Sequence, residues 1–355
     1  MTIKNYLCLL IGLIPFMSEA QTLGGKSAYS FVRMPVSPQV TALGGINISN
    51  RSDDVSIAFA NPALLSASMH SNLALNFNSL YDGISQYGLM QAYTHPRLKT
   101  NFAVGINYLN YGNITEADPS GMILGAFRPR DYSIQVSASR KYLNKWTYGS
   151  TIKLIHSNYG IYRSSAIAAD VGLLYADTAK FLQISVVAKN MGAILRKYQS
   201  GVEEELPFDL VLGISKKLEK APVQFSLTAH HLHRFDILYD DTLFNNSIGA
   251  PNGSSRKFTM EKLFQHLVFS TQIMIGKYIE VNAGYNFLRR RELRIFNVPS
   301  GLVGFSLGAG VIFPKLQIRY ARSYLQNTTA FNQLGINLPL NKYIGFGKWG
   351  EKSGW

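Results

Sequence analysis

Apolar and polar side chains alternate with a period of two through most of the chain after residue 70. In the stretch 131–140, Ile134 and Val136 fall on one face, while Ser133 and Gln135 fall on the other. Successive side chains of a β-strand point to opposite sides, so this pattern predicts strands with one apolar and one polar face. Each stretch has roughly nine or ten residues, enough to cross a hydrocarbon layer at a tilt of ~45°.

The pattern returns about fourteen times, an even number of the kind found in bacterial outer-membrane barrels. The predicted strands are residues 72–79, 84–93, 100–109, 131–140, 146–156, 167–175, 181–189, 209–217, 222–231, 266–275, 279–287, 301–312, 315–323 and 330–338. No helix-length segment separates them regularly, which disfavours a parallel α/β sheet. We therefore predict an all-β fold, a transmembrane antiparallel β-barrel of about 14 strands over residues 72–338.

The lengths of the connections give a second signal. Short connections, such as 94–99 and 276–278, alternate with longer ones, such as 110–130 and 157–166. Short periplasmic turns and longer outer loops are typical of an outer-membrane barrel, and a closed barrel leaves no open sheet edge in lipid. A soluble or surface-attached β-protein stays as the alternative, although it has no reason to sort its loop lengths by parity.

Both ends of the chain lie outside the repeat. Lys4 precedes an apolar stretch at 6–16, and the sequence SEA at 18–20 supplies a small-x-small cleavage site. This pattern predicts a secretory signal peptide over residues 1–20 and export to the outer membrane, with a buried N-terminal core helix as the alternative. Residues 339–355 are rich in Gly and Lys and predict a periplasmic tail, to which we assign no fold.

Residues 21–71 do not follow the repeat either. The segment is rich in Gly, Ser and Asn, and it contains the pairs Gly44-Gly45 and Asn61-Pro62. Its composition leaves two interpretations open. The segment is either a hatch that fills the mouth or lumen of the barrel, or a loosely ordered periplasmic extension.

Composition narrows the classes of function. Charged residues make up only 16% of the chain, against ~25% in usual soluble domains. The single cysteine, Cys8, lies in the predicted signal peptide, so the mature chain should contain no disulfide and no multi-cysteine metal centre. A formal net charge of +14 would suggest nucleic-acid binding in a cytosolic protein. Because the basic residues are spread along the chain of an exported barrel, we predict no nucleic-acid partner.

Histidines form the densest cluster of candidate chemistry. His231 and His233 are predicted to share one strand face, a spacing compatible with a metal ion, and Asp240 follows nearby. A metal site needs further ligands and supporting hydrogen bonds that the sequence does not reveal. We therefore predict no metal and no cofactor, and we assign both histidines to packing or partner contact. A surface hydrolase centred on His231 and Asp240 stays as an alternative.

A second candidate site is basic. Arg289, Arg290, Arg291 and Arg294 lie in a predicted outer loop, residues 288–300. Guanidinium groups bind carboxylates and phosphates through paired hydrogen bonds, so this cluster would suit an acidic partner surface or lipopolysaccharide. A solvated loop fits the same residues equally well.

Charged residues inside the predicted strands should face the lumen. A charge that faces lipid at the membrane midplane costs ~2–4 kcal/mol. The residues concerned lie on the polar faces of their strands and are Lys153, Asp170, Lys189, Glu280 and Arg319. A polar lumen counts against a channel for hydrophobic solutes, although an apolar pocket between hatch and wall would still permit one.

Four stretches resemble a known family. Residues 24–49 (GGKSAYSFVRMPVSPQVTALGGINIS) and 53–65 (DDVSIAFANPALL) resemble the PorV/PorQ group of the type IX secretion system, which is itself similar to FadL-type barrels. Residues 108–127 and 206–236 resemble the PorQ members rather than the PorV members. The resemblance implies a fourteen-stranded barrel with an N-terminal hatch, and no catalytic residue is carried over from it. It also implies a place in a cell-surface attachment complex with PorU, PorV and PorZ, in which PorQ holds PorZ.

The sequence thus supports three functions of different classes. The first is a non-enzymatic barrel that anchors a PorZ-like surface subunit, with PorU, PorV and outer-membrane lipid or lipopolysaccharide as further partners. The second is a FadL-like transporter of hydrophobic solutes, which needs an apolar pocket beside Asn61-Pro62. The third is the surface hydrolase. We predict the first, and therefore no enzymatic activity.

Overall fold

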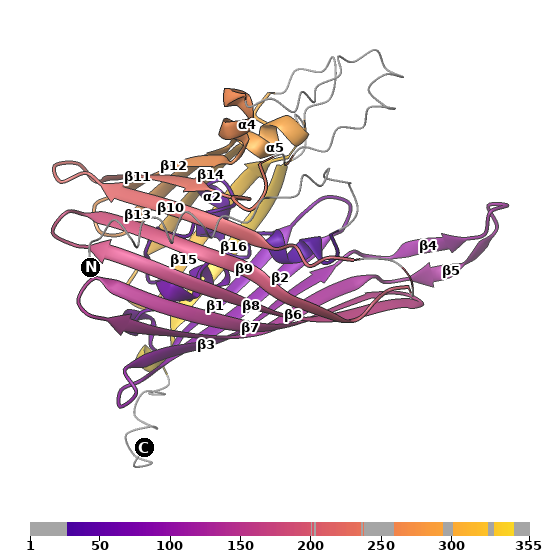
Figure 1. The fold of residues 1–355 in the computed structure, drawn as a ribbon, viewed down its shortest axis with the longest axis horizontal. Helices are drawn as coiled ribbons and strands as arrows, with labels where there is room; N and C mark the ends of the chain where they lie inside the picture. Colours follow the sequence, from indigo (N-terminus) through magenta and orange to yellow (C-terminus); the bar gives the residue numbers. More distant parts are fainter. Residues whose placement is uncertain are drawn as a thin grey trace, which may run out of the picture.

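The protein forms a closed β-barrel of antiparallel strands in a computed structural model (Figure 1). The structure describes residues 27–199, 201, 204–235, 237, 259–293, 301–325 and 330–343. The barrel strands are β1 (Asn72–Ser79), β2 (Ser85–His95), β3 (Thr100–Asn110), β6 (Arg130–Tyr142), β7 (Trp146–Tyr159), β8 (Tyr162–Asp177), β9 (Leu182–Arg196), β10 (Asp209–Lys217), β11 (Val223–Ala229), β12 (Leu267–Ile275), β13 (Ile279–Asn286), β14 (Phe305–Ile312), β15 (Gln317–Tyr324) and β16 (Ala330–Pro339). Strand β1 pairs with both β16 and β2, which closes the sheet and confirms the predicted barrel of fourteen strands.

The two faces of the barrel are reversed relative to a water-soluble protein. Apolar side chains such as Val104, which is 50% exposed, cover the outside, while polar ones such as Gln135, which is 2% exposed, line the inside. Apolar atoms outside and hydrogen-bonding groups inside suit a wall that stands in lipid. The predicted assignment of faces is confirmed: Ile134 is exposed on the outside and Ser133 is buried inside.

The connections at one end of the barrel are all short, whereas those at the other end range from the two-residue turn 160–161 to the much longer 111–129. Residues 96–99, 143–145, 178–181, 218–222, 276–278 and 313–316 join strands at one end, which we call the short-turn end. The opposite end, the long-loop end, carries the remaining connections and the helices α4 (Met260–Gln265) and α5 (Phe287–Glu292). No helix among the described residues has both the length and the apolarity needed to cross a membrane. The predicted signal peptide lies outside the described residues, as do residues 344–355 of the predicted tail.

One predicted long loop is wrong. Strands β7 and β8 continue toward each other, and Tyr159 pairs with Tyr162, so only residues 160 and 161 form the turn. Gly160 adopts a positive φ of 71° there, which a residue without Cβ adopts readily. The prediction failed because polar pairs such as Ser157 and Ser164 extend the ladder past the apolar band, where the alternation ends.

A second predicted loop contains an extra hairpin. Strands β4 (Ile114–Ala117) and β5 (Ile123–Phe127) pair with each other in a separate two-stranded sheet. The Asp118 carboxylate accepts hydrogen bonds from the backbone N–H groups of Ser120 and Met122, both 2.9 Å long, and thereby closes the turn. Figure 1 shows this hairpin projecting beyond the long-loop end of the barrel.

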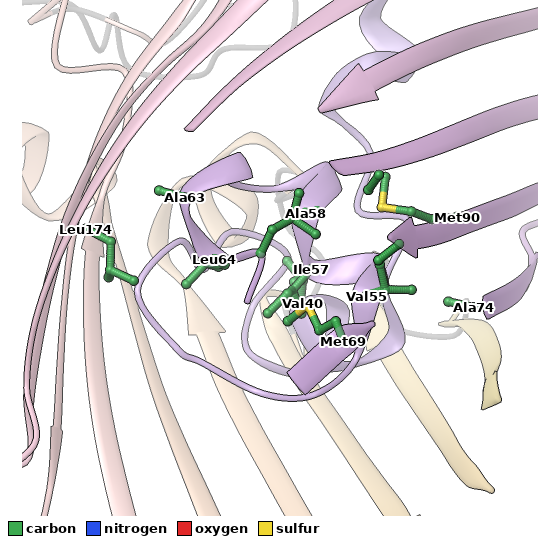
Figure 2. Close-up of a cluster of buried hydrophobic side chains, with 13 residues drawn as sticks. Val40, Val55, Ile57, Ala58, Ala63, Leu64, Met69, Ala74, Met90 and Leu174 are labelled. Atoms are coloured by element: carbon green, nitrogen blue, oxygen red, sulfur yellow. The ribbon is translucent and has the colours of Figure 1, made fainter. Parts of the chain in front are cut away.

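Residues 27–71 lie inside the barrel and form a hatch. Of the two interpretations left open by composition, the described part of the segment therefore fits the plug. It contains η1 (Ser30–Arg33), α2 (Pro38–Ala42), η2 (Val55–Phe59), η3 (Pro62–Leu64) and η4 (Ala67–Met69). Figure 2 shows its apolar residues, Ile57 and Leu64 among them, packed with Met90 and Leu174 of the wall. Burial of such side chains contributes about 1.5–3 kcal/mol each.

Glycines in the strands let the hatch approach the wall closely. A Cβ atom on Gly284 would lie 2.2 Å from the backbone nitrogen of Gly44, and one on Gly149 would lie 2.6 Å from the carbonyl carbon of Pro62. Gly44 also has a positive φ of 92°. The Asn61 side chain fixes the same contact region: its Nδ2 donates to the Ile48 carbonyl oxygen and to Ser185 Oγ on the wall, both at 2.8 Å.

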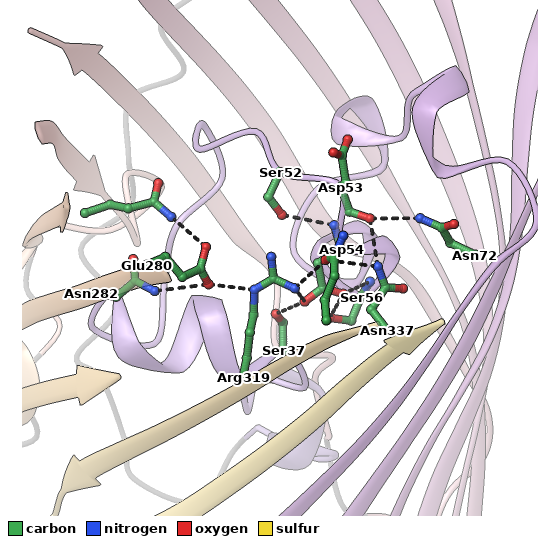
Figure 3. A network of polar contacts seen from close by, with 12 residues as sticks. Ser37, Ser52, Asp53, Asp54, Ser56, Asn72, Glu280, Asn282, Arg319 and Asn337 are labelled. Carbon is green, nitrogen blue, oxygen red and sulfur yellow. Dashed lines mark hydrogen bonds and ion pairs between the residues drawn. The ribbon is translucent and has the colours of Figure 1, made fainter. Parts of the chain in front are cut away.

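A buried ion network joins the hatch to the wall (Figure 3). Arg319 Nε donates to Glu280 Oε1 at 2.6 Å, and Arg319 Nη1 lies 3.7 Å from Asp54 Oδ2. Asp54 also accepts from the backbone N–H of Ser56 at 2.9 Å, which caps η2. We call Arg319, Glu280 and Asp54 the lumen clamp.

The other charges predicted for the lumen also face inward. Lys153 pairs with Asp170 at 2.6 Å, and both side chains are buried. Lys189 reaches from the wall to the carbonyl oxygen of Phe59 in the hatch at 3.5 Å. For these five residues the predicted lumen orientation is therefore confirmed, and ion pairs and hatch contacts offset part of the cost of burying them. Arg322, near the long-loop end of β15, is exposed on the outside.

Candidate functional site

The histidine cluster lies at the long-loop end, where β11 ends. Because β11 stops at Ala229, His231 and His233 do not share a strand face, and that prediction is wrong. His231 instead adopts a positive φ of 55° in the following turn. Its backbone N–H donates to Asp209 Oδ1 on β10 at 2.7 Å, and its Nδ1 lies 2.5 Å from Nδ1 of the buried His230.

Burial keeps these rings neutral. It lowers the pKa of His231 to about 4, with the charge of Arg33 as the next cause. It also lowers the pKa of His233 to about 4, against the opposing charge of Asp209. Neutral imidazole is the form that binds metals and the form that packs.

The cluster has the atoms of a metal site but is already satisfied by its own contacts. One ligand atom from each of Asp209, His230 and His231 lies within 4.8 Å of the others. However, the two rings contact each other, Asp209 already accepts a hydrogen bond, and the nearby Arg33 charge would repel a cation. This arrangement favours packing, and partner contact by His231 and His233 stays a prediction. Asp240, needed for the hydrolase, lies outside the described residues.

The arginine cluster is a helix rather than a loop. Arg289, Arg290 and Arg291 lie in α5, which Asn286 caps by accepting from the Arg289 backbone N–H at 3.0 Å. These residues lie in the connection between β13 and β14, as expected, but the connection begins with a capped turn of helix. Arg294 lies outside the described residues.

The three arginine side chains have different partners. Arg289 points inward, donates to Ser323 Oγ at 2.7 Å, and has its pKa lowered to about 10 by burial. Arg290 donates to the carbonyl oxygens of residues 301 and 303, at 3.1 and 3.2 Å. Arg291 forms an exposed ion pair with Glu261 of α4 at 2.9 Å. The cluster is thus largely internal, and of the three only Arg291 is placed to meet a partner through an exposed ion pair.

The hairpin β4–β5 is a candidate contact surface that the sequence interpretation missed. Its side chains Met122, Ile123 and Leu124 are 65%, 71% and 62% exposed. The hairpin that carries them projects beyond the long-loop end of the barrel (Figure 1), so these side chains are candidates for contact with another protein. The sequence signal was present, since Asp118-Pro119-Ser120-Gly121 is a turn sequence between short apolar runs.

A small cavity lies between the hatch and the wall. It measures about 80 Å³ and is lined by apolar hatch residues, including Val36 and Phe59, and by wall residues, including Lys189 and Asn190. An empty apolar cavity of ~150 Å³ takes up benzene, so this one is small even for a single aromatic ring. The cavity would have to widen before it could hold an aromatic solute.

The solved structures similar to this chain include channels and a porin. No family model matches the chain, and no curated protein matches it. Among solved structures, the chain is similar to the CymD monoaromatic hydrocarbon channel, with 15% identity, 85% of this chain and 96% of that chain covered, and a TM-score of 0.49. It is also similar to a TodX monoaromatic hydrocarbon channel mutant, with 13% identity, 86% and 97% coverage, and a TM-score of 0.48. The KdgM porin has 4% identity, 75% and 98% coverage, and a TM-score of 0.34.

Proposed function

We propose that this protein is a non-enzymatic outer-membrane barrel that anchors a surface protein. The observation that carries the proposal is the exposed apolar tip of β4–β5, Met122 to Leu124, beyond a barrel whose lumen the hatch occupies. Burial of each such side chain against a partner would contribute about 1.5–3 kcal/mol. Apolar anchors that enter a pocket of the partner carry most of the energy of such interfaces.

The finer form of this proposal comes from the sequence resemblance to PorQ. In it, the surface protein is PorZ-like, and the barrel belongs to the attachment complex of the type IX secretion system with PorU and PorV. Arg291 is exposed at the long-loop end of the barrel, the same end that carries the β4–β5 hairpin. Its guanidinium group would suit an acidic partner surface or lipopolysaccharide phosphate.

Two experiments test the anchor. The barrel is purified in detergent from its own outer membrane, and the proteins that accompany it are identified; we expect a PorZ-like subunit. In the cell, we expect Ile123→Asp to release that subunit into the medium. Leu98→Asp is the matched control, because Leu98 is also exposed but lies in a turn at the short-turn end. A surface subunit that stays cell-attached in a strain without the barrel would refute the anchor.

Transport of hydrophobic solutes is the second candidate function. It is favoured by the cavity at the hatch, which lies where such a transporter needs a pocket and has an apolar side formed by Val36, Val40 and Phe59. The probe is uptake of a monoaromatic hydrocarbon by cells with and without the barrel. Uptake that a deletion abolishes and that Ile123→Asp leaves intact would establish transport and separate it from anchoring.

A further inference from the structure

A basin opens at the long-loop end, between the start of the hatch and the ends of the neighbouring strands. It measures about 540 Å³, and tyrosines dominate its lining. Asp131 and Glu204 are the charged residues among the described residues that line it, and no lysine or arginine joins them. The described lining of this basin therefore carries negative charge, although the formal net charge of the whole chain is +14.

Four tyrosine rings follow one another around the basin. The ring centroids of Tyr29 and Tyr198 are 6.1 Å apart, those of Tyr198 and Tyr159 are 5.7 Å apart, and those of Tyr159 and Tyr111 are 5.7 Å apart. The rings come from the hatch and from three separate stretches near the barrel rim. Such a set of electron-rich faces attracts cations that lose their water.

The Asp131 carboxylate holds two of these rings and keeps one oxygen free. Asp131 Oδ2 accepts the hydroxyl hydrogen bonds of Tyr111 and Tyr159, at 2.7 and 2.8 Å. Asp131 is 1% exposed, and its Oδ1 has no hydrogen-bond partner among the described residues. A buried carboxylate oxygen without a donor is unfavourable, so this atom marks a position that a donor would fill.

Glu204 supplies a second such atom. Its Oε2 is buried and likewise has no hydrogen-bond partner within the part of the chain that the structure describes. Burial raises the pKa of Tyr29, and after the opposing hydrogen bond with Ser164 the charges of Glu204 and Asp131 raise it further. The two carboxylates therefore act on the same ring, and they approach the basin from different parts of the chain.

We propose that this basin binds an alkylammonium ion. The ammonium N–H groups would donate to Asp131 Oδ1 and Glu204 Oε2, and the carbon chain would lie against the tyrosine rings. A hydrocarbon would leave both carboxylate oxygens unpaired, and a metal ion would find only two carboxylates among phenol rings. The proposal does not depend on the anchoring function.

The test is a calorimetric titration of the purified full-length barrel in detergent at pH 7. The probe is n-hexylamine, which is protonated at that pH, and its neutral counterpart is n-hexanol. We expect hexylamine to bind at least about tenfold more tightly than hexanol, with an affinity that falls as salt is added. Equal binding of the two, or tighter binding of hexanol or of a neutral sugar, would overturn the proposal.

Variants locate the binding site. We expect Asp131→Asn and Glu204→Gln each to weaken hexylamine binding by roughly tenfold. Asp118→Asn is the matched control, because its carboxylate lies in the exposed turn of β4–β5, and it should leave the affinity unchanged. Glu204→Gln keeps the test decisive even if Asp131→Asn disturbs the tyrosines. If Glu204→Gln folds and binds hexylamine as tightly as the native barrel, the assignment of the binding site to this basin is wrong.

The same chemistry is available from two sources, a free amine or a lysine side chain of another protein. N-acetyl-lysinamide replaces hexylamine in a second titration to distinguish them. Binding of the lysine derivative as tightly as hexylamine indicates a protein source, and preference for hexylamine indicates a free amine. Failure of both to bind rejects the site.

Discussion

Removal of the Arg319 side chain should weaken the barrel more than any exposed charge does. Arg319→Met leaves Glu280 and Asp54 as buried carboxylates without their cation. Among the described residues, Glu280 then keeps the amide of Gln272, at 3.2 Å, and a weak contact with Asn282, at 3.5 Å. Loss of one partner of a buried ion pair typically costs about 3–5 kcal/mol, and we expect a decrease of that size in the free energy of unfolding.

The assay is denaturant unfolding of the purified barrel in detergent, followed by tryptophan fluorescence and by the shift in gel mobility on heating. Arg322→Met is the matched control, since Arg322 is on the same strand but exposed on the outside. Arg322 lies near the end of its strand, where a lipid-facing charge costs only about 0–1 kcal/mol, so its loss should change the unfolding free energy by no more than about 1 kcal/mol. The denaturant slope must stay the same for the comparison to hold.

A second substitution tests the physical reason. The double variant Arg319→Met, Glu280→Gln also removes the charge of Glu280, which the single variant leaves unpaired. Asp54 still accepts its hydrogen bonds from Ser56. Replacing a buried ion pair by neutral groups is often close to neutral, so we expect recovery to within about 1–2 kcal/mol of the native protein. A single variant as stable as the native barrel, or a double variant less stable than the single one, would refute the reasoning.

Three further predictions use the same unfolding assay. Gly284→Val should lower the unfolding free energy by about 1–3 kcal/mol because its Cβ would overlap the hatch backbone, whereas Gly125→Val, with open space around it, should not. Asn61→Ala should cost about 2–4 kcal/mol, since it removes the η3 cap and two buried hydrogen bonds; a loss below about 1 kcal/mol contradicts this. The folded pKa of His231 is lowered from 6.5 to about 4, so its stability contribution is complete above pH 6.5 and is lost as pH falls toward 4. Native barrel should therefore lose about 2–3 kcal/mol more than His231→Gln between pH 7 and pH 4, and parallel pH profiles would disprove it.

The strands could be predicted because their signal is local. The limits of β1 and β10 coincide with the predicted segments 72–79 and 209–217, since alternation begins and ends with the pleat itself. The closure of the barrel could be predicted from the even number of strands and from the need to pair both edges of the sheet in lipid. The inward orientation of Arg319 could also be predicted, because a charged side chain that faces lipid near the membrane midplane has a high free-energy cost.

The candidate sites could not be predicted in the same way. The basin joins Tyr29, Tyr111, Asp131, Tyr159, Tyr198 and Glu204, which are neighbours only after the barrel closes around the hatch. The consecutive arginines of α5 look alike in the sequence, yet one is buried, one holds backbone carbonyls and one pairs with α4. Helical geometry sends consecutive side chains in directions 100° apart, so the helix, and not the composition, separates their roles.

The sequence by itself determined the strands, their inward and outward faces and the polar character of the lumen, because a two-residue period needs no distant partner. Only the tertiary structure decided that the hatch fills the lumen, that apolar residues lie on a projecting hairpin, and that Asp131 and Glu204 line one basin with four tyrosines. These features depend on contacts between residues far apart in the sequence. The register of the strands and the closure of the barrel decide which of those residues come together.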